Sequence, residues 1–278
     1  MSSPSVDYAT LFGIHSVAGA AIFAVLFFGM GAWFLKQSIK YTTFVYIVLT
    51  LFCSIRVPTY TIRAIMAHST SEGSNLHVFI ADQVLFGVGF WVLLYSAYTL
   101  TLDRDIIAGG EPGSIFSLNF FRNPHAFHMF LLAGVALSII GVVDGTSSYT
   151  SEASTGHTLR KAGTIVFLGL TVLQAAQMIW FARDTSHSNS STRPWGDRNG
   201  KYLLAIISIM MLVREVFLTA TMNNSNKQND ERLWYPLVAL PEFLAMICYS
   251  VSGLVPTRAA LKERSQRIRM ALIPSTVQ

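Results

Sequence analysis

The residues of this sequence best suited to chemistry are ionisable side chains that lie inside long apolar stretches. They are His15, Arg56, Arg63, Asp82, Asp144, Arg214, Glu215 and Glu242. A charge in a stretch that crosses a membrane is costly, so it faces a bundle interior or a water-filled cavity and usually pairs with another charge. With Asp144 set aside because it lies near the end of its stretch, three arginines are matched by three carboxylates. We therefore expect ion pairs between them.

The spacing of these residues predicts how they are oriented. Arg56 and Arg63 are seven residues apart, which places them on one helical face, with Pro58 bending the helix between them. Arg214 and Glu215 are adjacent, hence about 100° apart around a helix, and we expect them to point at different neighbours. Counted at about 1.5 Å per residue, all the charges lie in the outer half of the membrane, with Arg56 deepest.

Two interpretations of this layer of charge are open. In the first, the ion pairs fix helix packing and register. In the second, the residues line a water-accessible cavity that binds an amphiphile. Arginines would hold a phosphate or carboxylate head, or Asp82 and Glu242 would hold an amine, while aromatic walls hold the apolar tail. Both can hold at once.

Other chemistry finds little support in the sequence. The histidines have no metal-ligand spacing, and the last apolar stretch lacks the lysine that a retinal pigment needs. Phosphate-binding glycine loops and nucleophile elbows are absent from the sequence. We expect no metal and no cofactor. The Asp103–Arg104 pair, at the inner end of an apolar stretch, we interpret as a surface charge that obeys the positive-inside rule.

The elements that position these residues are membrane-spanning helices. Of the 278 residues, 52% are hydrophobic and only 13% are charged, against about 25% charged in soluble domains, and this excludes a water-soluble enzyme. Stretches long enough to cross a membrane fall at about 10–35, 41–66, 76–102, 125–146, 161–183, 201–222 and 234–256. We expect an all-α fold: a seven-transmembrane helix bundle over 1–256, followed by a basic tail over 257–278.

The distribution of Lys and Arg predicts the orientation in the membrane. Thirteen fall on the side of the C-terminal tail and only four, Arg160, Lys161, Lys227 and Arg232, on the other. The N-terminus is then outside and the C-terminus cytoplasmic, and the first apolar stretch is a span rather than a cleaved signal peptide. The basic tail either binds anionic lipid or is simply solvated, and nothing in this distribution points to nucleic acid.

Two pairs of stretches are alike. In 41–66 with 76–102, and again in 201–222 with 234–256, a helix with a deep arginine (Arg56, Arg214) is followed by one with a carboxylate (Asp82, Glu242). This pattern predicts two parallel three-helix repeats joined by the fourth span, with a site between them.

Several motifs resemble those of the fungal resistance-to-aminocholesterol (RTA-like) seven-helix family, whose members are described as lipid-translocating exporters. They are YTIRA (60–64), IADQVLFGVGFWVLLYSAY (80–98) with Arg104, GTIVFLGLTVLQ (163–174), LVREVF (212–217) and ERLWYPLVALPEFLAMICYSVSGLVP (231–256). The chain departs from the family pattern at Leu218 and Thr221, where a second arginine and a glutamate are usual, and at Val255–Pro256, where His–Pro is usual. The acidic residue of the last span is shifted to Glu242.

The resemblance implies a fungal protein of the plasma membrane or endoplasmic reticulum that handles sphingoid bases or sterol-like amphiphiles. Together with the charges it singles out Arg63, Arg214, Glu231 and Glu242. The leading hypothesis is therefore a protein that binds or translocates a membrane lipid or lipophilic small molecule. A receptor-like sensor, an intramembrane acid–base enzyme such as an isomerase or cyclase, and a purely structural role remain as alternatives.

Overall fold

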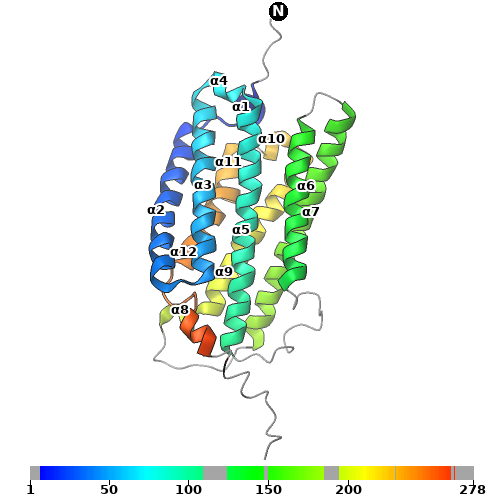
Figure 1. Cartoon of the computed structure of the whole chain (residues 1–278). Coiled ribbons are helices and arrows are strands. Elements are labelled where there is room, and N and C mark those ends of the chain that lie inside the picture. Colours follow the sequence, from blue (N-terminus) through cyan, green and yellow to red (C-terminus); the bar gives the residue numbers. More distant parts are fainter. Residues whose placement is uncertain are drawn as a thin grey trace, which may run out of the picture.

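The fold is described by a computed structural model that covers residues 7–108, 124–146, 150–184, 194–228, 230–263 and 266. Within these ranges every regular element is a helix, and there is no strand (Figure 1). The helices are α1 (Tyr8–Leu11), α2 (Val17–Tyr41), α3 (Phe44–His68), α4 (Thr70–Gly73), α5 (Leu76–Ala108), α6 (Pro124–Gly145), α7 (Thr150–Asp184), α8 (Trp195–Arg198), α9 (Gly200–Thr221), α10 (Ser225–Gln228), α11 (Glu231–Trp234), the π-helical turn η1 (Tyr235–Ala239) and α12 (Leu240–Tyr249).

Six of the described helices are long and apolar enough to cross a membrane: α2, α3, α5, α6, α7 and α9. Many of their large apolar side chains point away from the bundle, for example Val25, Phe28 and Ile39, which are 71%, 67% and 73% exposed. Lipid tails are the natural cover for such a surface, since monomeric soluble proteins rarely expose large contiguous apolar patches. The chain is an integral, multi-pass, all-helical membrane protein.

Two of the long helices begin at other residues than the apolar stretches suggested. The expected stretch at 10–35 divides, because Gly13 takes a positive φ of 64° and ends the short helix α1, and α2 starts only at Val17 after the Ser16 cap. The stretch expected at 161–183 lies within a longer helix, α7, which already begins at Thr150. Polar residues at the start of α7 concealed its first three turns from a search for apolar stretches.

The segment expected as a seventh span, 234–256, is helical but irregular. Helix α11, the π turn η1 and α12 follow one another without a break from Glu231 to Tyr249. Leu240 N–H donates to the Tyr235 carbonyl, five residues back, and Pro241 has no N–H to continue a regular α-helical ladder. The segment therefore changes its winding one turn before Glu242.

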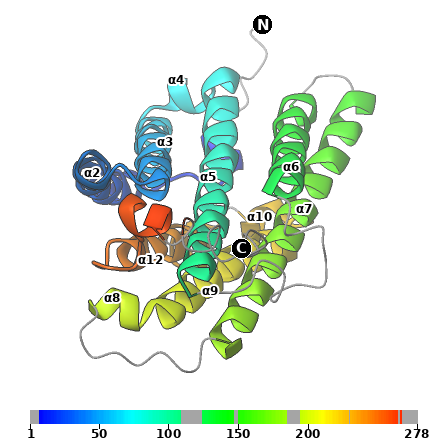
Figure 2. The same cartoon turned by 60° about the horizontal axis from the view of Figure 1, so that its bottom comes forward.

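The helices pack in the order in which they follow along the chain. Helix α2 lies against α3, α3 against α5, α5 against α6, α6 against α7, α7 against α9 and α9 against α12, and α12 returns to α2 (Figure 2). Helix α5 also contacts α7 and α9 and so lies toward the middle of the bundle. Residues far apart in sequence, such as those of α3 and α12, can then meet in the interior.

Glycines bring the backbones of α6 and α7 into close contact. A Cβ atom added at Gly156 would overlap the backbone of Gly145, and one added at Gly141 would overlap the backbone of Arg160. Small residues allow two membrane helices to approach until their backbones touch. This contact fixes the position of α7 and with it the residues that follow Gly156.

The two ends of the bundle carry different short elements. Helices α1, α4 and α10 lie at one end, which we call the α1 end, and α8 lies at the other, which we call the α8 end (Figure 1). The described residues after α12 are also at the α8 end.

Candidate functional site

Four charged side chains from three helices form a chain of ion pairs in the interior. Arg56 of α3 donates from Nη2 to Oε1 of Glu242 at 2.5 Å, and both side chains are at most 1% exposed. Arg214 of α9 lies with its Nε 2.7 Å from the same oxygen, a contact without hydrogen-bond geometry. Arg214 also pairs with Glu215. One carboxylate of α12 therefore serves two arginines from different helices.

The pairing of Arg214 with Glu215 differs from what the sequence suggested. Adjacent residues on a helix leave the backbone about 100° apart, so we expected different neighbours. The long guanidinium side chain instead curls back to its own neighbour, and both side chains are at most 3% exposed. That expectation was wrong because it considered the directions of the Cβ atoms and not the reach of an arginine.

A second ion pair lies closer to the α1 end. Arg63 Nε donates to Asp82 Oδ1 at 3.0 Å, and Gln83 Nε2 donates to the other oxygen of Asp82 at 3.1 Å. The guanidinium of Arg63 also lies 3.8 Å from the centre of the Trp234 ring, where a cation–π attraction stabilises it. Asp82 is therefore fully engaged.

The aromatic ring of Phe86 joins the two ion-pair groups. The guanidinium carbons of Arg56, Arg63 and Arg214 lie 4.8, 5.3 and 4.7 Å from its centre, and Arg56 Nη1 donates to its carbonyl at 3.0 Å. Sequence reasoning overlooked Phe86. The available signal was its position one helical turn after Asp82, on the same face of α5.

A glycine makes room for the deepest arginine. A Cβ atom at Gly89 would come within 2.8 Å of Nη1 of Arg56, so no larger residue fits there unless the guanidinium moves. Three polar atoms around this pair have no hydrogen-bond partner among the described residues: Arg56 Nε, Tyr60 Oη and Glu242 Oε2. Buried polar atoms usually find a partner in protein or water, so the network has capacity for a further polar group.

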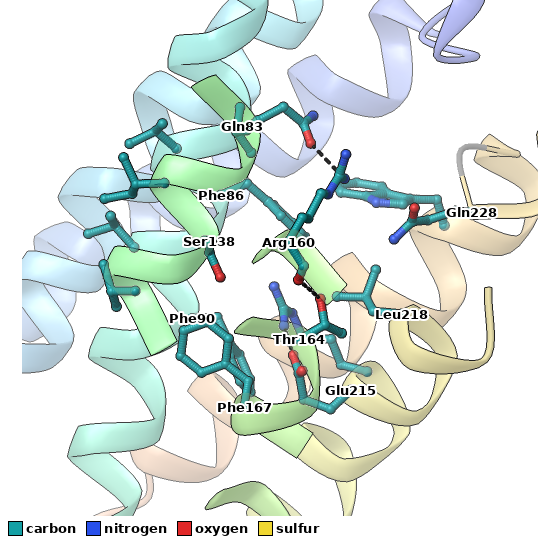
Figure 3. A pocket seen from close by; sticks show the side chains of 18 of the residues that line it. Gln83, Phe86, Phe90, Ser138, Arg160, Thr164, Phe167, Glu215, Leu218 and Gln228 are labelled. Carbon is teal, nitrogen blue, oxygen red and sulfur yellow. Dashed lines mark hydrogen bonds and ion pairs between the residues drawn. The ribbon is translucent and has the colours of Figure 1, made fainter. Parts of the chain in front are cut away.

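Beside the network lies a cavity of about 90 Å³ between α5, α6, α7 and α9, with α10 and α11 contributing Gln228 and Trp234 (Figure 3). Its polar lining includes Arg63, Arg214 and Glu215 of the network. Its apolar lining includes side chains of all four long helices, among them valines of α5 and α6. The volume of the cavity is more than the space that one water molecule needs.

Arg160 lines this cavity and is the most informative residue that the sequence did not reveal. We expected it outside the membrane, just before a span starting at 161, but it lies within α7 and its side chain reaches into the cavity (Figure 3). Its Nη2 donates to Gln83 Oε1 at 3.2 Å. No ion pair joins it to a carboxylate in the part of the chain that the structure describes. The polar first turns of α7 hid its position from a search for apolar stretches.

Two candidate residues lie outside this network. Glu231, at the start of α11, accepts hydrogen bonds on Oε1 from the backbone N–H groups of His15 and Ser16, each at 3.0 Å. The His15 residue is exposed. Glu231 thus binds the backbone next to the start of α2 and tethers it to α11. His15 contributes its backbone to this contact.

At the α8 end, Arg104 forms a further buried cluster. It is 6% exposed, donates from Nε to the Leu254 carbonyl at 2.8 Å, bonds to the Gly253 carbonyl, and pairs with Asp197 of α8. Our interpretation of Arg104 as a surface charge was therefore wrong. In the sequence, Arg104 only follows an apolar stretch and lies among charged residues. That local pattern gives no sign of the Gly253 and Leu254 carbonyls, which the fold brings next to Arg104.

The described residues contain no group of three or more His, Cys, Asp or Glu side chains that could hold a metal ion. The arrangement offers instead what an amphiphile requires: fixed charges and hydrogen-bond donors at one place, and apolar walls beside them.

Comparison with known proteins adds a family and no activity. A family model described as a domain of unknown function, DUF7702, matches residues 14–259. This range contains the whole ion-pair network and every residue that lines the cavity. No curated protein and no solved structure matches the chain.

Proposed function

Because the chain belongs to the DUF7702 family, a domain of unknown function, we propose its activity from the site: it binds or translocates a lipid or other amphiphile through the cavity between α5, α6, α7 and α9. The cavity carries this proposal. It combines fixed charges with apolar walls inside a bundle whose outer surface suits lipid. Ligand pockets likewise combine apolar walls with placed polar groups that orient the ligand.

The proposal includes seven spans. The segment from Glu231 to Tyr249 has 19 helical residues, about 28 Å at 1.5 Å per residue, which approaches the thickness of the hydrocarbon layer. The last part of α2, with Lys36 and Lys40, lies at the same end of the bundle as α8, with Arg198 (Figure 1). This supports a cytoplasmic α8 end and an outer α1 end. The cavity is then in the outer half, because its lining residues come from the first part of α5 and the last part of α9.

The membrane and the ligand class rest on the resemblance to RTA-like proteins. It favours the plasma membrane or the endoplasmic reticulum, and a sphingoid base or a sterol-like lipid as the ligand. The basic segment after α12 begins at Arg258 and is exposed in its described part, a position that supports contact with anionic lipid headgroups.

The test uses a residue that can fill the cavity without touching the charges. Gly87 lines the cavity, and a Cβ atom added there would meet nothing within 4 Å. Gly169 of α7 also has open space around it but does not line the cavity. Gly87→Leu should therefore occupy the cavity, while Gly169→Leu is the matched control. Both changes replace a helical glycine by a better helix former, so folding should be preserved.

The measurement compares wild type and both variants in liposomes. We would measure binding of fluorescent amphiphiles that share one alkyl chain and carry a phosphate, an amine or a hydroxyl group, then transbilayer movement and chemical change of those that bind. Binding by wild type and Gly169→Leu, with loss in Gly87→Leu, is the expected result. Equal binding by all three proteins would refute the cavity as the binding site.

The same assay separates the alternative functions. Binding without movement would favour a receptor-like sensor, and a chemically altered lipid would reveal an intramembrane enzyme. If no amphiphile bound to any of the three proteins, while their circular dichroism showed intact helices, the ion pairs would be left with a structural role alone.

A further inference from the structure

The cavity and the network together carry one more positive than negative side chain. Asp82, Glu215 and Glu242 supply three carboxylates, and the arginines that pair with them are Arg56, Arg63 and Arg214. Arg160 is the fourth arginine. Its one hydrogen bond from the guanidinium goes to the uncharged side-chain oxygen of Gln83. The sequence led us to expect three arginines balanced by three carboxylates. No fourth carboxylate of the network balances the charge of Arg160.

An uncompensated cation inside a membrane protein favours an anion beside it. Taking a charge out of water costs free energy that only a counter-charge or several hydrogen bonds restore. Arg160 has further N–H donors, and it lines the cavity together with Ser138, whose hydroxyl points into it (Figure 3). A phosphate or carboxylate oxygen accepts such donors, and its bonds to a guanidinium are among the strongest in proteins.

The carboxylates of the site are not free to hold an amine. Asp82 is bonded on both oxygens, by Arg63 and by Gln83. Glu215 is paired with Arg214. Glu242 contacts Arg56 and Arg214 through Oε1, and although its Oε2 has no hydrogen-bond partner among the described residues, Glu242 does not line the cavity. An amine headgroup in the cavity would therefore have to displace an arginine and would meet the charge of Arg160. Like charges at short range repel, which disfavours a cationic ligand.

We propose that the cavity recognises the anionic group of its ligand, a phosphate or a carboxylate, through Arg160, with the alkyl chain against the apolar walls of α5 and α6. This rests on the proposed function and narrows its ligand, because a free sphingoid base carries an amine head and is thereby disfavoured. The volume of about 90 Å³ exceeds what one water molecule needs, which leaves space for a small anionic group. The valines of α5 and α6 beside it suit the first carbons of a chain.

The test removes one positive charge at each of two adjacent positions, in two separate variants. Arg160→Gln removes the charge that lines the cavity, and Lys161→Gln removes the same charge from the next residue, which is exposed and does not line it. Wild type and both variants are placed in bilayer discs of zwitterionic phospholipid, which has no net charge. Dissociation constants are measured for hexadecyl phosphate, hexadecylamine and hexadecanol, and inorganic phosphate alone is added as a competitor.

The expected result is a preference that depends on Arg160. Hexadecyl phosphate should bind wild type and Lys161→Gln at least about tenfold more tightly than hexadecylamine does, and Arg160→Gln should lose about tenfold or more of that affinity. Hexadecanol should bind all three proteins alike, which shows that Arg160→Gln is folded. Competition by inorganic phosphate at similar concentrations would assign the site to a free ion, and its failure to compete would assign it to a lipid headgroup.

Other outcomes overturn the anion preference without touching the proposed function. If the amine binds as tightly as the phosphate, or if Arg160→Gln leaves the affinity for hexadecyl phosphate unchanged, the inference is wrong. If Gly87→Leu at the same time loses hexadecanol binding, the cavity is still supported as the site that binds amphiphiles.

A different outcome would end the proposed function itself: none of the three amphiphiles binds wild type.

Discussion

Arg56 and Glu242 are 186 residues apart in the chain, and their side chains meet at 2.5 Å in the interior of the bundle. Neither is more than 1% exposed. Glu242 also lies against Arg214, and it follows directly after Pro241 at a change of helical winding. A single carboxylate thereby connects α3, near the start of the circuit of helices, with α9 and α12 at its end.

Replacing this carboxylate should destabilise the protein strongly. Glu242→Gln leaves Arg56 without a counter-charge, and breaking a buried pair from one side costs about 3–5 kcal/mol. Thermal unfolding in detergent micelles should show a lower midpoint than for Glu72→Gln, a carboxylate at the α1 end. The double variant Arg56→Met with Glu242→Gln should recover at least half of the loss, because Arg214 keeps Glu215. No difference between Glu242→Gln and Glu72→Gln would contradict the role of this pair.

Glu231 and His15 should behave differently, although the sequence suggested both as site residues. Glu231→Ala removes the acceptor for two backbone N–H groups before α2, and loss of such a cap costs about 1 kcal/mol. His15→Ala keeps its backbone N–H and should leave stability within about 0.5 kcal/mol of wild type. Hydrogen exchange at the start of α2 measures the effect. Equal protection of those amides in Glu231→Ala and wild type would argue against this contact.

The contact between α6 and α7 should not tolerate a methyl group. Gly156→Ala would place a Cβ atom into the Gly145 backbone, and we expect a loss of roughly 1–3 kcal/mol because the two helices must move apart. Gly169→Ala, on the same helix and in open space, should gain up to about 1 kcal/mol from helix propensity. Unfolding midpoints of both variants test this. A stabilised Gly156→Ala would disprove close contact at that position.

The Arg104 cluster should stabilise the turn after α12 at the α8 end of the bundle. Arg104→Lys keeps the charge but loses the planar set of donors that reaches Asp197 and the carbonyls of Gly253 and Leu254. We expect about 1–3 kcal/mol of lost stability and faster hydrogen exchange in the turn after α12. Lys40→Gln, an exposed charge change at the same end, is the control. Exchange in that turn unchanged by Arg104→Lys would show that the cluster does not hold it.

Much of the fold could be predicted from hydropathy alone, because membrane helices are defined by local composition and length. Six of the expected spans match long apolar helices, and the irregular segment from Glu231 to Tyr249 occupies the place of the seventh. The two parallel repeats stay a prediction. Their proposed equivalence does not extend to the contacts, since Asp82 pairs with Arg63 whereas Glu242 contacts both Arg56 and Arg214.

The candidate site was only partly predictable, and Arg160 shows the reason. Its identity as a cavity residue depends on where α7 begins and on how closely Gly156 lets α7 approach α6. Both are consequences of packing between helices. A search for apolar stretches places a polar helical turn outside the membrane whenever no partner helix is known to cover it.

By itself, the sequence determined that this chain is an all-helical membrane protein with charges placed among apolar residues, because each of those properties depends on neighbours along the chain. Only the tertiary structure decided which charges meet, that Glu242 is shared by two arginines, and that Arg160 is left over beside a cavity. Those relationships join residues up to 186 positions apart, and no local pattern of hydropathy or spacing contains the packing that brings them together.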